Sequence, residues 1–421
     1  MIQNPLKLFN IATFLQTQLF LLPVLLLFYQ HNGLNLEDFF LFQGIFSIAS
    51  LLFEVPSGYL GDLFPKKNVL IASFCFFILR CVLWLFFAKY GYWVLLAGEI
   101  LFAAHKAFYT GVSDAYIYEY LDARGEPQTM SKHYGFLYAF VSAGTALSSL
   151  SAAWLYAKVS GWTLAHYGQD YGFTVLLGLE LVLNIAATIL LCQLPKIATP
   201  QRPKKSLKEI YVNFFRIIVW TLKNGRIRSH IVLAAFLWGA TALFIWSFQP
   251  MMQLLLIPVS MFGVVYFMNH ACRMTFSGKT GTLTQYLTIK QLGMISFVWY
   301  VFGFVLSVMI LWMQPLPLMV NLGYFLFIAI GTGWQIAYGN VHLGRLHKIV
   351  PKDIRATASS VSFMMGRLFC AFFLISLKFL IKDFSLMMSM GICAVVFLCG
   401  IFPLKKVCSI WAEEEGEKVC S

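Results

Sequence analysis

The sequence predicts an all-α membrane protein with twelve transmembrane helices in two six-helix halves. Of its 421 residues, 59% are hydrophobic and only 12% are charged, whereas soluble domains are about 25% charged. Apolar runs of about 20 residues, the length that crosses a bilayer, recur along the chain. Lys and Arg gather between these runs. A chain this apolar cannot hide its surface from water, so we expect the lipid bilayer to be its solvent.

The first half, residues 1–194, contains six predicted spans. Its first apolar run is too long for a signal peptide and lacks a small-residue cleavage site, so we interpret it as a retained span. Pro23 and Pro56 lie within predicted spans, where neighbouring helices can satisfy the carbonyls that proline leaves free. The six spans lie near residues 8–30, 38–61, 68–88, 92–121, 132–158 and 171–194.

The second half, residues 229–404, repeats this layout and is followed by a tail over 405–421. Its second span is the most polar, because Asn269, His270 and Arg273 crowd its end. Between the halves, residues 195–228 form a basic linker. Apolar residues at helical spacing among Lys and Arg over 207–222 predict an amphipathic helix on the membrane surface, with a calmodulin-like partner as the alternative. The six spans lie near 229–249, 253–276, 289–313, 316–341, 356–378 and 384–404.

Basic residues predict the orientation of the chain. Of 31 Lys and Arg, 24 lie at the termini, in the central linker or in even-numbered loops, and four lie in or beside odd-numbered loops. Because cytoplasmic loops are enriched in Lys and Arg, both termini are predicted to be cytoplasmic. The net charge of +13 therefore reflects membrane topology, and we expect no nucleic-acid partner.

Neither a metal site nor a nucleotide site is expected. The nine Cys are scattered without a C-x-x-C pair, which disfavours structural disulfides and zinc. Phe276–Gly281 superficially suggests a phosphate loop, but that motif requires Gly where Arg273 stands. We expect no cofactor.

A charged, glycine-containing loop follows the second span. Its residues Gly58, Leu60, Gly61, Asp62, Lys66 and Lys67 resemble the motif G-x-L-[GA]-D-R-x-G-R-[RK] of the major facilitator superfamily, which joins helices 2 and 3 there. Leu63 replaces the usual Arg and Pro65 the usual Gly. The segments Ser113–Glu119 and Arg355-Ala356-Thr357 are similar to a bacterial subgroup. The resemblance implies a major facilitator fold in a bacterial inner membrane, with two halves around a midplane site.

The resemblance also implies a conformational latch at the cytoplasmic face. In the family, the loop Asp lies over the start of span 11 and the loop Arg pairs with an acid at the end of span 4. Leu63 cannot be that cation, so Lys66 or Lys67 would replace it. The latch residues are predicted to be Gly58, Gly61, Asp62, Lys66, Lys67, Asp114 and Glu119.

Glu54 and Arg367 extend the predicted latch into the membrane. They lie about 12 Å and about 15 Å inside spans 2 and 11, which the resemblance places opposite each other. The matching depths predict an ion pair between the halves that forms in one state and breaks in another. The alternative is that each finds partners within its own half.

A third set of residues predicts the solute and proton site. Glu99, His105 and Lys106 lie within span 4, and ionisable groups at bilayer depth are functional candidates. A buried Lys near a carboxylate could bind an anionic group or carry a proton; the alternative is a neutralised structural pair. The resemblance implies that spans 1, 4, 7 and 10 line the cavity, which adds Gln16, Gln18, Gln249, Gln335 and Asn340.

Together these patterns predict a secondary active transporter, acting as a monomer, that moves a small-molecule substrate by alternating access, coupled to a proton by symport or antiport. A transport-dead receptor or scaffold is one alternative. A membrane enzyme is another, but no cluster of catalytic His, Asp or Glu occurs near one face of the predicted spans.

Overall fold

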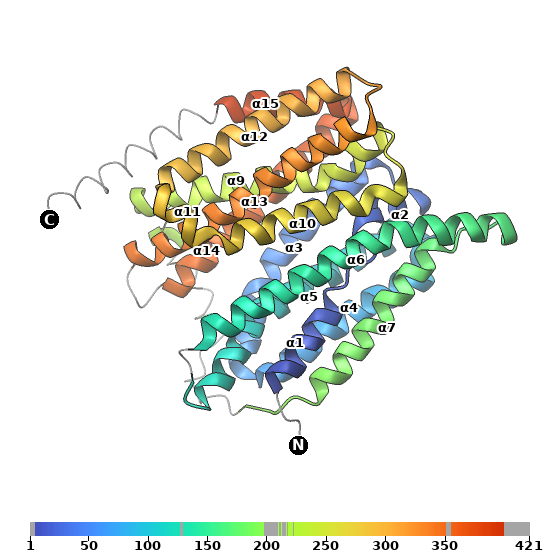
Figure 1. Ribbon diagram of the computed structural model, residues 1–421. Coiled ribbons are helices and arrows are strands. Elements are labelled where there is room, and N and C mark those ends of the chain that lie inside the picture. The colour runs from blue at the N-terminus through green and yellow to red at the C-terminus, as the bar shows by residue number, and fades with distance from the viewer. Residues whose placement is uncertain are drawn as a thin grey trace. The chain divides into compact units, whose positions relative to one another are not determined.

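The computed structural model is built from helices (Figure 1). It describes residues 5–126, 129–197, 223–350 and 355–399, with a few positions between 209 and 221. Seven of the described helices are long and apolar enough to cross a membrane, judged by length and composition. Other predicted spans are interrupted, shorter or more charged. The predicted amphipathic helix over 207–222 falls largely outside the described residues, and the tail over 405–421 lies wholly outside them.

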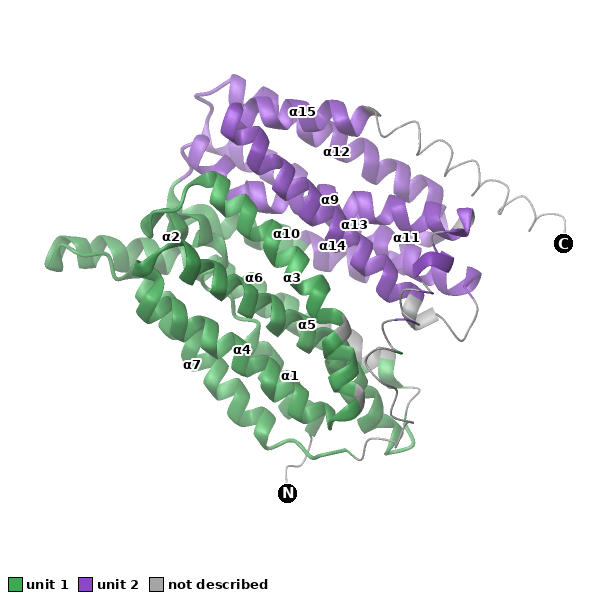
Figure 2. Ribbon diagram, turned by 180° about the vertical axis from the view of Figure 1, so that it is seen from behind, with its two compact units in different colours: residues 1–210, 258–271 green, residues 211–257, 272–421 purple. Residues whose placement is uncertain are grey.

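The chain divides into two compact units (Figure 2). Unit 1 contains residues 1–210 and 258–271, and unit 2 contains residues 211–257 and 272–421. The first part of the eighth predicted span therefore packs within unit 1, although it follows the central linker in sequence.

Unit 1 contains the first six predicted spans. Asn35 begins the second with a capping box, because its side chain accepts the Asp38 N–H at 2.8 Å and the Asp38 carboxylate accepts the Asn35 N–H. The helices are α1 (Pro5–Gln16), η1 (Leu22–Val24), α2 (Leu25–His31), α3 (Leu36–Leu63), α4 (Lys66–Phe87), η2 (Ala88–Tyr90), α5 (Tyr92–Asp122), α6 (Met130–Tyr167) and α7 (Gly172–Cys192), followed after the linker by η4 (Val259–Met261) and the first part of α10 (Phe262–Gly278).

The motif between the second and third spans is more helical than the sequence suggested. Helix α3 continues through Gly58 and Gly61 to Leu63, and α4 begins at Lys66. Only Phe64 and Pro65 separate the two helices. Pro65 has no N–H and disfavours a helical residue before it, so α3 ends at this point.

Unit 2 contains α9 (Gly225–Leu254), α11 (Thr280–Tyr286), α12 (Ile289–Trp312), α13 (Leu318–Ile349), α14 (Arg355–Asp383) and α15 (Leu386–Cys399). Helix α9 passes through Pro250, and the chain turns afterwards at Leu256, whose φ is +53°. The predicted start of the next span at 253 is therefore wrong, because the helix begins at Phe262. No polar residue marks this turn in the sequence.

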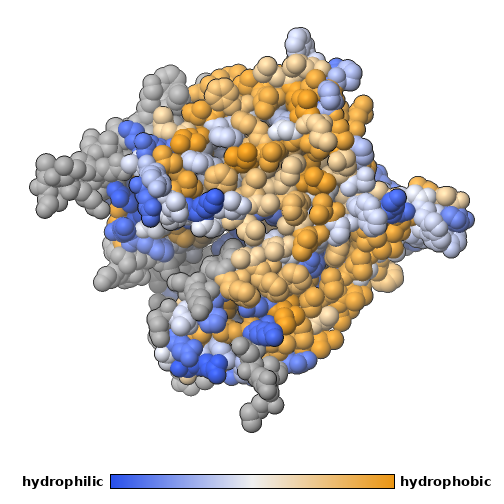
Figure 3. Space-filling view, in the orientation of Figure 1, coloured by the Kyte–Doolittle hydropathy of each residue, from blue (hydrophilic) through white to orange (hydrophobic). Residues whose placement is uncertain are grey.

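Hydrophobic residues cover the outer flanks of the helices in each unit. On the face in Figure 3 they occupy most of the visible surface, and hydrophilic residues gather towards helix ends and loops. Phe302, Phe372 and Trp312 are among the exposed side chains. An apolar surface of this extent is expected where lipid replaces water.

Candidate functional site

The first span of unit 1 is interrupted midway. Helix α1 ends at Gln16, and helical structure resumes at Leu22. Backbone groups freed at bilayer depth need partners within the protein. The Leu21 N–H donates to Glu180 Oε1 at 2.7 Å, so a carboxylate from α7 takes the place of the missing helical carbonyl.

Arg80 of α4 holds Glu180 in place. Its Nη1 donates to Glu180 Oε2 at 3.1 Å, and both residues are almost fully buried. The guanidinium also lies 4.1 Å from the ring centroid of Trp84 and 4.7 Å from that of Phe102. Glu180 of α7 therefore forms an ion pair with the neighbouring helix α4.

Glu99 lies beside this ion pair on α5. Its carboxylate accepts a hydrogen bond from the Tyr29 hydroxyl of α2, and the residue is 2% exposed. Arg80 is near enough for its charge to act on Glu99 as well as on Glu180. One guanidinium therefore faces two buried carboxyl groups.

His105 lies six residues after Glu99 on α5 and contacts residues of α1 and α4. Its Nδ1 lies 2.9 Å from the Ser73 carbonyl oxygen, which can only accept, so Nδ1 carries the hydrogen. Its Nε2 lies 2.6 Å from Gln16 Nε2, an amide donor at the end of α1, so Nε2 is the acceptor. This arrangement describes a neutral imidazole. Because His105 is 0% exposed, its contacts are those of an internal brace.

Lys106 and Gln18 occupy less enclosed positions. Lys106 is half-buried, and its Nζ lies 5.2 Å from the ring centroid of Phe102. Gln18, within the interruption of the first span, donates from Nε2 to the Phe14 carbonyl at 2.8 Å. Of the five residues predicted from spans 1 and 4, these two are the most exposed, although Gln18 is only 7% exposed, and Gln18 also lines a groove.

The polar residues predicted from unit 2 differ in their burial. Gln335 is 0% exposed, and neither of its amide atoms has a hydrogen-bond partner among the described residues. Gln249 is also buried. Asn340 is exposed and donates to the hydroxyls of Ser277 and Thr280 at 3.3 Å. Asn340 therefore braces the α10–α11 turn.

Several predicted latch residues meet at the α3–α4 turn. Lys66 Nζ lies 3.6 Å from Glu119 Oε1 on α5 and donates to the Gly61 carbonyl. Lys67 Nζ donates to the carbonyls of Cys192 and Leu194 at 2.7 and 2.6 Å, where the end of α7 favours a cation.

The remaining predicted latch residues are placed as follows. Asp114 accepts a hydrogen bond from Ser113 at 3.3 Å. The Asp62 side chain lies outside the described set. Glu54 belongs to unit 1 and Arg367 to unit 2, and their pairing stays a prediction.

Removing Lys66 should weaken the α3–α5 contact. We expect Lys66→Ala to lower the free energy of unfolding by about 1–3 kcal/mol, because it leaves the Gly61 carbonyl without this donor and Glu119 without this cation. In a double-mutant cycle with Glu119→Gln, measured by reversible unfolding in detergent, the pair should couple by about 0.5–1.5 kcal/mol. Lys89→Ala is the exposed control. Additive losses would exclude an energetic link between Lys66 and Glu119.

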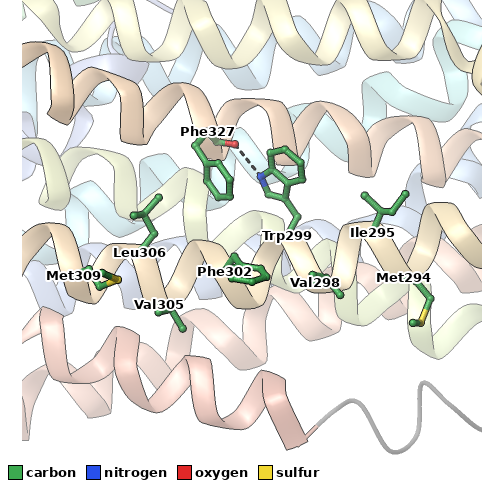
Figure 4. Close-up of a pocket in the computed structure, with 9 residues that line it drawn as sticks. All are labelled: Met294, Ile295, Val298, Trp299, Phe302, Val305, Leu306, Met309 and Phe327. Atoms are coloured by element: carbon green, nitrogen blue, oxygen red, sulfur yellow. Dashed lines mark hydrogen bonds between the residues drawn. The ribbon is translucent and has the colours of Figure 1, made fainter.

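A groove of ≈ 630 Å³ runs along α12 in unit 2, with α13 contributing Phe327 (Figure 4). Its lining side chains are apolar, and the one polar atom among them, Trp299 Nε1, already donates to the Phe327 carbonyl at 3.0 Å. No group remains to orient a polar solute, so this groove is not the solute site. Among the described residues, no group of three or more His, Cys, Asp or Glu could hold a metal ion.

Sequence reasoning missed part of the buried network. Arg80 is a charge within an apolar run, but nothing in the sequence links it to a residue 100 positions later. Tyr29 and Ser73 gave no signal, because a Tyr or Ser in an apolar run is ordinary. A usable rule is that a lone Arg and a lone Glu in different spans should first be tested as a pair.

The buried charges of unit 1 lie within apolar helices, where ionisable residues mark functional sites. A family model described as Major Facilitator Superfamily matches residues 8–374. The chain belongs to the Major Facilitator Superfamily and is a secondary transporter. A comparison with curated protein sequences finds no match.

Solved transporters share the fold. A variant of the nucleoside transporter NupG superposes with a TM-score of 0.76 at 14% identity, covering 96% of this chain and 100% of the other. A D-xylose-proton symporter gives 0.71 at 15%, covering 97% and 96%. A variant of the peptide transporter POT gives 0.70 at 12%, covering 96% and 94%. These similarities support the predicted twelve-helix major facilitator fold.

Proposed function

We propose that this transporter couples the movement of a small solute to a proton, and that Glu99 carries the proton. Lys106 and Gln18 are proposed to face the solute path, and Lys66 with Glu119 to form part of the latch. The protein is proposed to act as a monomer in a bacterial inner membrane. The asymmetry of Lys and Arg supports cytoplasmic termini.

The charge balance around Arg80 carries the proposal. Arg80 stays protonated in proteins, and it makes a direct ion pair with Glu180. Glu99 is the second carboxyl group near this cation, and its carboxylate accepts a hydrogen bond from the neutral Tyr29 hydroxyl. A second ionised carboxyl group at bilayer depth that has no cation in direct contact is costly. A proton on Glu99 removes that cost, and its gain and loss provide a coupling step.

The test replaces Glu99 with Gln, which keeps the size and a hydrogen-bond acceptor for Tyr29 but cannot release a proton. Wild-type proteoliposomes containing a pH-sensitive dye should show solute-dependent proton influx. We would begin with a nucleoside and D-xylose, solutes that the similar transporters carry. Glu99→Gln should reduce this proton influx to the background of empty liposomes.

The control is Glu126→Gln, the same chemical change at an exposed loop position. It should leave proton influx unchanged. Solute exchange without net proton movement should survive in Glu99→Gln, since the solute path is intact. Proton influx at the wild-type rate in Glu99→Gln would show that another group carries the proton.

A further inference from the structure

The interruption of the first span opens a groove in unit 1. The groove has a volume of ≈ 510 Å³ and lies between Gln18 and Phe20 of the interrupted segment and a face of α6 that carries Ser148, Ser151 and Trp154. In a continuous helix, the backbone N–H and carbonyl groups along this stretch would have bonded to one another. The interruption is held by Glu180, so the shape of the groove depends on a buried ion pair.

The groove lies on a definite side of α6. Leu147, which also lines it, is nine residues from Tyr156, and this spacing places the two on opposite faces of the helix. Tyr156 packs on Phe173 of α7, with ring centroids 4.4 Å apart. The groove therefore opens on the side of α6 that faces away from α7.

The polar side chains of the groove can act mainly as hydrogen-bond acceptors for a solute. Ser148 Oγ donates to the Thr145 carbonyl at 3.1 Å, and Ser151 Oγ donates to the Leu147 carbonyl at 3.0 Å. Gln18 Nε2 donates to the Phe14 carbonyl. With the hydroxyl hydrogens used inside the protein, the two hydroxyl oxygens keep lone pairs that can accept from a solute, and the Gln18 amide keeps its oxygen as an acceptor and its second N–H as a donor.

The apolar part of the groove is aromatic. Trp154 is 55% exposed, and Phe20 is half-buried beside it. An aromatic face binds a flat apolar surface, and a few acceptors set the orientation of its hydroxyl or N–H groups. No ionisable side chain lines the groove, so a charged solute would lose water there without gaining a partner.

We propose that this groove binds the transported solute, and that the solute is an uncharged hydroxylated ring compound of the sugar or nucleoside class. The proposal deepens the transport function above and depends on it for the direction of movement. Binding itself does not depend on Glu99 or on a proton gradient.

The test measures equilibrium binding to the purified full-length protein by calorimetry. The probes are D-xylose and uridine as neutral rings, D-glucuronate as an anion and choline as a cation. At least one neutral ring should bind, and the two ions should bind at least about tenfold more weakly. Trp154→Ala should weaken neutral-ring binding roughly 5- to 150-fold, the range of a lost stacking contact.

A matched control is available on the same helix. Trp162 is 54% exposed and stacks on His166, away from the groove. Trp162→Ala should bind like the wild type. Ser151→Ala, which removes an acceptor with little change in volume, should give a smaller loss than Trp154→Ala.

Three results would overturn the proposal. They are tighter binding of glucuronate or choline than of either ring, binding of neither ring, and equal binding by the Trp154→Ala and Trp162→Ala variants. Glucuronate binding that is lost in Lys106→Ala would leave a transporter with an anionic solute. Ring binding at the groove without any solute flux in proteoliposomes would instead contradict the transport function.

Discussion

Glu180→Ala should lower the free energy of unfolding by about 3–5 kcal/mol, the range for removing one partner of a buried ion pair. The change leaves the Arg80 guanidinium at bilayer depth without its direct partner, and it removes the acceptor of the Leu21 N–H. Arg80→Ala should have a similar effect. The measurement is the unfolding free energy of the purified protein in mixed micelles.

A double variant separates the two contributions. In Arg80→Met with Glu180→Leu, no unpaired charge remains, so most of the loss should be recovered. A deficit of about 1–3 kcal/mol should persist, because the Leu21 N–H still lacks its acceptor. Glu126→Ala, at an exposed loop position, should stay within about 0.5 kcal/mol of the wild type. Single variants as stable as this control would show that the ion pair does not hold the interruption.

Gly263→Ala should be strongly damaging for a change of a single methyl group. A Cβ at this position would lie 2.2 Å from the Ser149 carbonyl oxygen and 2.8 Å from that of Leu150. Both atoms belong to the backbone of α6, so no side chain can move aside. We expect a loss of about 3 kcal/mol in unfolding free energy, the upper end for overpacking.

The matched control for this variant is Gly178→Ala. Gly178 lies within α7, and a Cβ there would meet nothing within 4 Å. Because Ala favours the helix over Gly by about 1 kcal/mol, this control should be neutral or stabilising. If Gly263→Ala unfolds like Gly178→Ala, then α6 and α10 do not meet at backbone contact.

The twelve-span pattern followed from composition because each apolar run had to be long enough to cross a bilayer. The turn at Leu256 escaped notice, since it contains apolar residues on both sides and Pro250 offered a more conspicuous break. The interruption after Gln16 had a local signal, because Thr17 and Gln18 are polar and Pro23 stands where the helix resumes. The feature that stabilises the break gave no such signal, because it is a Glu 159 residues further on.

The sequence could predict which residues belong to the candidate site, but not which partners they contact. Glu99, His105 and Lys106 were identifiable because ionisable residues are rare in apolar runs. The sequence grouped these three residues with one another, whereas the structure gives two of them partners on other helices. His105 contacts Gln16 and Ser73, and Glu99 accepts from Tyr29. These partners come from helices whose neighbours are set by tertiary packing. Sequence spacing along one helix carries no information about them.

The bond between Leu21 and Glu180 also has a consequence for how the protein is made. The second piece of the first span, Leu22–His31, is too short to cross a bilayer alone. Glu180, which accepts from the Leu21 N–H just before this piece, is synthesised 159 residues later. At ordinary translation rates this is a delay of roughly 8–30 s. During that interval the nascent first span lacks its final bond. Stalling translation before α7 should therefore leave a cysteine introduced into this span, which has none of its own, more accessible to thiol-modifying reagents than in the completed protein.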